Sequence, residues 1–78
     1  REAINPIHIY PNPVSETLFI QTDLTPVSYH IFDVLGNEIM SGAQISEQGL
    51  YIGHIPPGNY TLLLQYDEFV QSIDFIKK

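Results

Sequence analysis

The chain has 78 residues, which predicts a single domain, and it contains no cysteine, so a disulfide and a thiolate metal site are both excluded. Three lysine and arginine residues against nine aspartate and glutamate residues give a formal net charge of -6, which argues against nucleic acid and anionic membrane surfaces as partners. No apolar run approaches the roughly 20 residues of a membrane-spanning helix, so we expect no transmembrane segment.

Apolar residues alternate with polar ones along most of the chain, and this period of two predicts strands. The runs are rich in β-branched and aromatic residues, as half-buried strands are. They cover residues 7–9, 17–21, 27–34, 38–41, 60–66 and 69–76. Turn signals separate them at residues 35–38, 56–59 and 67–68, and residues 46–49 form a polar loop. No segment has helical spacing over three turns, so we expect no substantial helix.

Short strands and closely spaced turns predict an all-β fold. We expect a single small antiparallel β-sandwich of the immunoglobulin-like kind, with about seven short strands, and a small closed barrel is the alternative. The domain spans residues 1–78, and its start at Arg1 rather than methionine suggests excision or processing from a larger precursor. The predicted core consists of Ile9, Leu18, Ile20, Tyr29, Ile31, Ile39, Ile52, Ile55, Tyr60, Leu62, Leu64, Ile73 and Phe75.

Two prolines, Pro11 and Pro13, flank Asn12 between the first two predicted strands. Proline has no N–H group and it favours extended backbone in the residue before it. The segment therefore predicts a stiff, extended link that ends one strand and starts the next. Such a link could carry the chain from one sheet to the other and protect a sheet edge from pairing with other chains.

The sequence shows no catalytic constellation, so we expect no enzymatic activity, metal or cofactor. It lacks a G-x-S-x-G motif, and its serines occupy loop or outward strand positions. His8, His30 and His54 lie far apart, which favours solvated histidines over metal ligands. The carboxylates form no calcium-loop motif, and the aromatic residues are better explained as core and rim than as a platform for sugars.

Several short motifs follow one another in a fixed order. They are Tyr10-Pro11-Asn12-Pro13, Leu18-Phe19-Ile20, the hairpin strand from Tyr29 to Gly36 with Asp33 in it, the Pro57-Gly58-Asn59-Tyr60-Thr61-Leu62 corner, and the closing Phe75-Ile76-Lys77-Lys78. This order resembles the C-terminal sorting domain of the type IX (Por) secretion system of Gram-negative bacteria, whose motifs include "YPNP", "I-[YF]-D-x-x-G" and "xGxYxL".

The resemblance implies a function without chemistry of its own. Such a domain follows a cargo domain in an exported protein, and a translocon at the outer membrane recognises it as a folded signal. A sortase-like protease then removes it, so that the cargo reaches the cell surface or the extracellular space. The residues that the resemblance implies for recognition or folding are Tyr10, Pro11, Asn12, Pro13, Asp33, Gly36, Gly58, Tyr60, Lys77 and Lys78.

The chain departs from the family pattern at two places. The family often has a lysine in the strand after the "GxY" corner, where this chain has Leu63-Leu64-Gln65, and a basic residue after the hairpin glycine, where it has Asn37-Glu38. A second family, of small exported bacterial β-sandwich proteins of unknown function, shares the hairpin and the corner. That likeness implies a free-standing or accessory module that binds a glycan or protein at the cell surface, and the "YPNP" motif favours the sorting domain.

Overall fold

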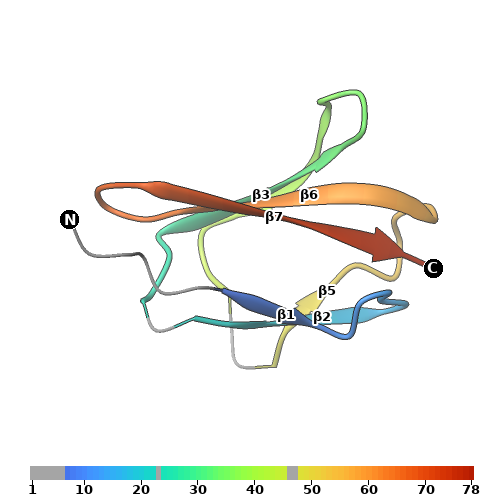
Figure 1. Ribbon diagram of the computed structural model, residues 1–78, viewed down its shortest axis with the longest axis horizontal. Coiled ribbons are helices and arrows are strands. Elements are labelled where there is room, and N and C mark those ends of the chain that lie inside the picture. Colours follow the sequence, from blue (N-terminus) through green and yellow to red (C-terminus); the bar gives the residue numbers. More distant parts are fainter. Residues whose placement is uncertain (1–6, 23, 46–47) are drawn as a thin grey trace.

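The computed structural model describes residues 7–22, 24–45 and 48–78, which form strands and no helix. Two antiparallel sheets face each other as a sandwich (Figure 1). One sheet has the order β1 (His8–Tyr10), β2 (Thr17–Gln21), β5 (Leu50–Tyr51), and the other has the order β4 (Glu38–Gly42), β3 (Ser28–Asp33), β6 (Gly58–Gln65), β7 (Val70–Lys77). The predicted all-β sandwich is confirmed. Within the described ranges, nothing helical has the length and apolar character needed to cross a membrane.

The core lies between the two sheets and follows the alternation of the strands. Apolar residues on the inner faces of both sheets become buried, because successive side chains of a strand point to opposite faces. The buried apolar residues are Ile7, Val14, Leu18, Tyr29, Ile31, Leu50, Ile52, Ile55, Tyr60, Leu62, Leu64, Tyr66 and Phe75. Three further predicted core residues, Ile9, Ile20 and Ile73, are partly buried against this cluster.

The prediction that Ile39 belongs to the core is wrong, since its side chain is 37% exposed. The pairing of β3 with β4 shifts at this point: Ile31 pairs with Met40, and Phe32 pairs with Glu38. Ile39 is therefore the extra residue of a β-bulge, which removes it from the alternation. Met40 occupies the inward position instead and packs against the core.

The proline segment differs from its prediction in a similar way. β1 and β2 pair antiparallel within one sheet, with Ile9 opposite Ile20, so the chain must reverse direction between them. Pro11, Asn12 and Pro13 lie in bends of this connection, and both X–Pro peptide bonds are cis. The segment is therefore a hairpin loop within the three-stranded sheet rather than an extended crossing between sheets.

The strand β5 has only two residues, which is too short for a period of two to reveal it in the sequence. Leu50 pairs with Leu18 and is buried, although only Ile52 was expected in the core at this point. The loop predicted at residues 46–49 includes residues 46 and 47, which lie outside the described part of the chain.

Leu62 and Leu63 are neighbours on β6 that point to opposite faces, so they test the placement of the core. Leu62 is fully buried, and we expect Leu62→Ala to lower the free energy of unfolding by about 2–5 kcal/mol through lost burial and a cavity. Leu63 lies partly exposed on the outer face, so Leu63→Ala should cost clearly less. Chemical denaturation of both variants measures the difference, and equal losses would contradict the assignment of the faces.

Candidate functional site

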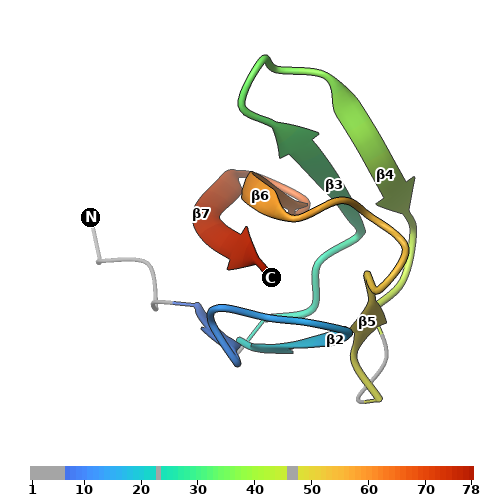
Figure 2. The same cartoon turned by 90° about the vertical axis from the view of Figure 1, so that its right-hand side faces the viewer.

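The sequence motifs meet at one end of the sandwich. The loop between β1 and β2, the start of β6 and the end of β7 lie at the right-hand side of Figure 1, and the β3–β4 turn lies at the top of the view. Figure 2 looks onto this side, with the C-terminus between the β1–β2 loop and the β3–β4 hairpin. We call this region the C-terminal end of the sandwich.

The β1–β2 loop binds the end of β7 through three hydrogen bonds. The side-chain Oδ1 of Asn12 accepts the N–H of Ile76 at 3.0 Å, and the N–H of Val14 donates to the carbonyl oxygen of Ile76 at 2.8 Å. The N–H of Lys78 donates to the carbonyl oxygen of Val14 at 2.8 Å, which completes a short parallel bridge between Val14 and Lys77. Because Val14 is also fully buried, the "YPNP" loop fixes the last residues of β7 against the other sheet.

The Gly58–Tyr60 corner supports the same strand from the opposite side. Gly58 pairs with Lys77 and Tyr60 pairs with Phe75 across β6 and β7. Gly58 has φ +155°, a backbone conformation that favours glycine. The hydroxyl group of Tyr60 donates to the carbonyl oxygen of Pro56 at 2.6 Å, and its ring stacks on Phe75 with the centroids 5.7 Å apart. Tyr60 thus closes the corner and holds the end of β7.

Asp33 organises the β3–β4 turn. Its carboxylate accepts the N–H of Leu35 at 3.0 Å and the N–H of Asn37 at 2.9 Å, and Gly36 has φ +86° at the tip. The hydrogen bond from the Asn37 N–H is the main cause that lowers the pKa of the Asp33 carboxyl below its ordinary value. Asp33 also pairs with Tyr60 across β3 and β6, so the turn is positioned by the corner.

The two lysines predicted at the C-terminal end differ in their surroundings. The side chain of Lys77 points inward and is only 6% exposed, and its Nζ donates to the main-chain oxygen of Lys78 at 2.9 Å. Lys78 is exposed. Only Lys78 therefore presents its side-chain charge to a partner, whereas the stem of Lys77 contributes to packing.

A hollow of about 380 Å³ opens on the outer face at this end. It is lined by Asn12, Val34, Asn59, Tyr60, Thr61, Asp74, Phe75 and Ile76. Val34 is 75% exposed and Ile76 is 48% exposed, so part of the lining is apolar and accessible. Thr61 donates from its hydroxyl group to the Asp74 carboxylate at 2.8 Å, which leaves this pair satisfied. An apolar lining beside a satisfied polar pair suits contact with another polypeptide.

The remaining predicted residues stand around this hollow rather than in it. Tyr10 is exposed and stacks on Phe19 with the ring centroids 5.4 Å apart. Pro11, Pro13 and Gly36 are exposed loop residues. The structure therefore brings Asn12 and Tyr60 into one lining, with Asp33, Gly58 and Lys77 paired beside it.

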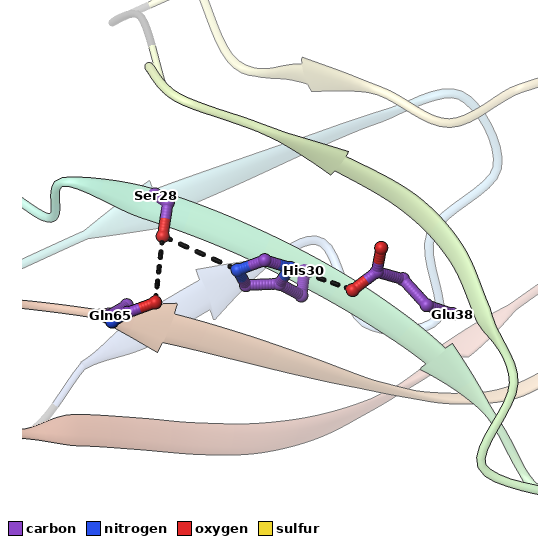
Figure 3. A network of polar contacts seen from close by, with 4 residues as sticks. All are labelled: Ser28, His30, Glu38 and Gln65. Carbon is purple, nitrogen blue, oxygen red and sulfur yellow. Dashed lines mark hydrogen bonds and ion pairs between the residues drawn. The ribbon is translucent and has the colours of Figure 1, made fainter.

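A second polar cluster lies on the outer face of the four-stranded sheet, and the sequence analysis did not foresee it. Figure 3 shows Ser28 and His30 on β3, Glu38 on β4 and Gln65 on β6. His30 Nδ1 lies 2.8 Å from Glu38 Oε1, and His30 Nε2 lies 3.4 Å from Ser28 Oγ. The expectation that His30 points outward agrees with this placement, but its partners depend on the register of three strands, which the sequence does not reveal.

The order serine, histidine, carboxylate resembles a catalytic triad, but the proton of Ser28 has another destination. Ser28 Oγ donates to Gln65 Oε1 at 3.2 Å, and an amide oxygen can only accept. The single hydroxyl proton of Ser28 is thus not given to His30 Nε2, where a general base would accept it. The cluster is therefore a surface network that joins β3, β4 and β6. Among the described residues, no three histidine or acidic side chains gather in a way that could hold a metal ion.

The comparison with protein families agrees with this picture. The secretion system C-terminal sorting domain matches residues 8–78, which include β1 to β7, the strands of the described part of the chain. The chain belongs to this family. A search of curated proteins finds no match. Sorting domains act as C-terminal signals for type IX secretion, and the family is not catalytic. The resemblance noted in the sequence is therefore confirmed, and it favours the sorting domain over the free-standing binding module.

The lowered pKa of Asp33 predicts a pH-dependent contribution to stability. Since the folded pKa lies below the ordinary 3.8, the contribution is complete above that value and is lost as the pH falls through the folded pKa. We expect Asp33→Ala to lower the melting temperature at about pH 7, and the difference from the unchanged sorting domain to shrink towards about pH 2. Asp67→Ala, at the exposed β6–β7 turn, is the control. A difference that does not depend on pH would contradict the prediction.

Asn12 should stabilise the end of β7 through its side-chain oxygen. Asn12→Ala leaves the N–H of Ile76 without this acceptor and should lower the free energy of unfolding by about 1 kcal/mol. Asn12→Asp keeps an acceptor oxygen and should lose less. Amide hydrogen exchange should become faster at Ile76 in the alanine variant. Asn59→Ala, in the same lining, is the control. If the Ile76 amide exchanges as fast in this variant as in Asn12→Ala, the result argues against a specific role for Asn12.

Proposed function

We propose that this sorting domain is a folded, non-catalytic signal that directs an N-terminal cargo protein across the bacterial outer membrane by type IX secretion. The translocon recognises the C-terminal end of the sandwich, and a sortase-like protease then removes the domain. The cargo is released or remains at the cell surface. Membership of the family supports the role of export signal. The hydrogen bonds of Asn12 and Val14 with the end of β7 are the observation that supports a folded signal rather than an unstructured tail.

The arrangement of the chain suits a domain that follows a cargo. β1 begins at His8, away from the C-terminal end of the sandwich, where β7 finishes (Figure 1). A cargo joined before β1 would leave the hollow and Lys78 accessible to a partner. A cut on the N-terminal side of His8 would also leave both sheets intact, because no strand among the described residues begins earlier.

One residue from each of the two departures from the family pattern belongs to the surface network of Figure 3. Glu38 lies close to the position where the family usually has a basic residue, and its carboxylate pairs with His30. Gln65 lies in the strand that often carries a lysine in the family, and its side-chain oxygen accepts a hydrogen bond from Ser28. None of the four residues in the network lines the hollow. The departures therefore lie outside the lining at the C-terminal end, which supports a sorting role for this chain.

Export of a reporter protein tests the proposed function. A reporter followed by residues 1–78 should leave the periplasm of a host with a type IX system. Deletion of residues 76–78 removes the main-chain partners of Val14 and the N–H that Asn12 binds, so the reporter should accumulate in the periplasm.

Lys78→Ala is the control for this deletion, because it removes one exposed charge and keeps every main-chain hydrogen bond at this end. If this variant fails as completely as the deletion, the signal is the terminal charge and not the folded end. If the unchanged fusion stays in the periplasm, the proposed function is wrong.

A further inference from the structure

The four edge strands of the sandwich differ in how they are protected from pairing with another chain. β1 has three residues and runs into Pro11, and β5 has two residues. The pairing of β4 contains the bulge at Ile39. Short length, proline and bulges are the usual protections of an edge. β7 has eight residues in continuous register with β6, and it contains no proline.

The main-chain groups of β7 alternate between its two sides. In antiparallel pairs, the N–H and C=O groups of every second residue point away from the partner strand. Ile76 points away from β6, since both its N–H and its C=O are bonded to the β1–β2 loop. Ser72 and Asp74 have the same phase, so their N–H and C=O groups face the open edge. Among the described residues, no main-chain group bonds to them on that side.

The domain itself already pairs a loop residue with this edge. Val14 pairs in parallel with Lys77, and Asn12 takes the next hydrogen-bonding position at Ile76. Ser72 and Asp74 precede Ile76 in β7, and their main-chain N–H and C=O groups continue the same edge of the strand. The Asp74 side chain is exposed, and its carboxylate is held by Thr61 at 2.8 Å beside the hollow.

We propose that the open edge of β7 at Ser72 and Asp74 is a strand-addition site for an extended segment of the secretion machinery. This inference rests on the proposed function, and it names how the machinery binds: by main-chain hydrogen bonds to β7. The exposed carboxylate of Asp74 and the net charge of -6 favour a segment that carries a lysine or arginine.

Ser72→Pro tests the edge without touching the pairing of β6 with β7. Proline removes the N–H of Ser72, which faces the open edge, and places its ring there, while the N–H groups of Gln71 and Ile73 still face β6. In the reporter fusion, we expect export to fall about tenfold or more. Ser72→Ala is the matched control, because it removes the same side-chain hydroxyl and keeps the main chain, and its export should stay within about twofold of the unchanged fusion.

The outcomes separate this inference from the proposed function. If the unchanged fusion is not exported, the proposed function fails. If the unchanged fusion and folded Ser72→Pro are exported equally, strand addition is wrong and the sorting function stands. Circular dichroism and thermal unfolding show whether the variant is folded. If it is not, Asp74→Pro against Asp74→Ala makes the same comparison at the next outward position.

Amide hydrogen exchange in the unchanged 78-residue chain tests the edge without a variant. We expect the N–H groups of Ser72 and Asp74 to exchange much faster than those of Ile73 and Phe75, which face β6. Fast exchange supports an open edge. Protection at every protein concentration would mean that the chain covers its own edge, and protection that grows with concentration would make a second copy the occupant. Either result overturns the proposal.

Discussion

The pairing of Val14 with the end of β7 is the interaction on which the C-terminal end of the sandwich depends. Val14 lies in the loop between β1 and β2 of the three-stranded sheet, whereas β7 belongs to the four-stranded sheet. Among the main-chain hydrogen bonds of the described residues, those of Val14 are the ones that join the two sheets. The remaining contacts between the sheets are mainly those of apolar side chains, which have no direction, with one hydrogen bond between the hydroxyl groups of Thr22 and Tyr66 at 3.1 Å near the other end. Hydrogen bonds with fixed geometry therefore set the register of the two sheets at this end and hold Ile76 beside Asn12.

This link helps to explain why residues of different motifs lie together. Asn12 comes from the first connection, Asp33 from the β3–β4 turn and Tyr60 from the corner before β6, and each is attached to its neighbour by a pairing or a hydrogen bond. A partner that binds this surface recognises the folded domain rather than a linear sequence at its end. The outer network around His30 connects β3 with its neighbours β4 and β6 through side-chain hydrogen bonds.

The sequence was sufficient to predict the class of fold and most of the core, because alternation is a local signal and survives in β2, β3, β6 and β7. It was insufficient where pairing decides the outcome. The bulge at Ile39 and the burial of Val14 depend on which strand lies opposite. The motif residues could be named through a family resemblance, but the contact of Asn12 with Ile76 spans 64 positions and leaves no local trace. The inward turn of Lys77 is hidden for a related reason, since a terminal lysine is usually solvated.

The order of the paired segments along the chain has a further consequence. Asn12 and Val14 lie near the beginning of the domain, and their partners lie in the final strand, after every other strand. The surface at the C-terminal end therefore does not exist while the chain is still being made, even when six of its strands are complete. A domain whose synthesis stops before β7 lacks this surface, so the geometry makes the signal a mark of a domain that has its last strand.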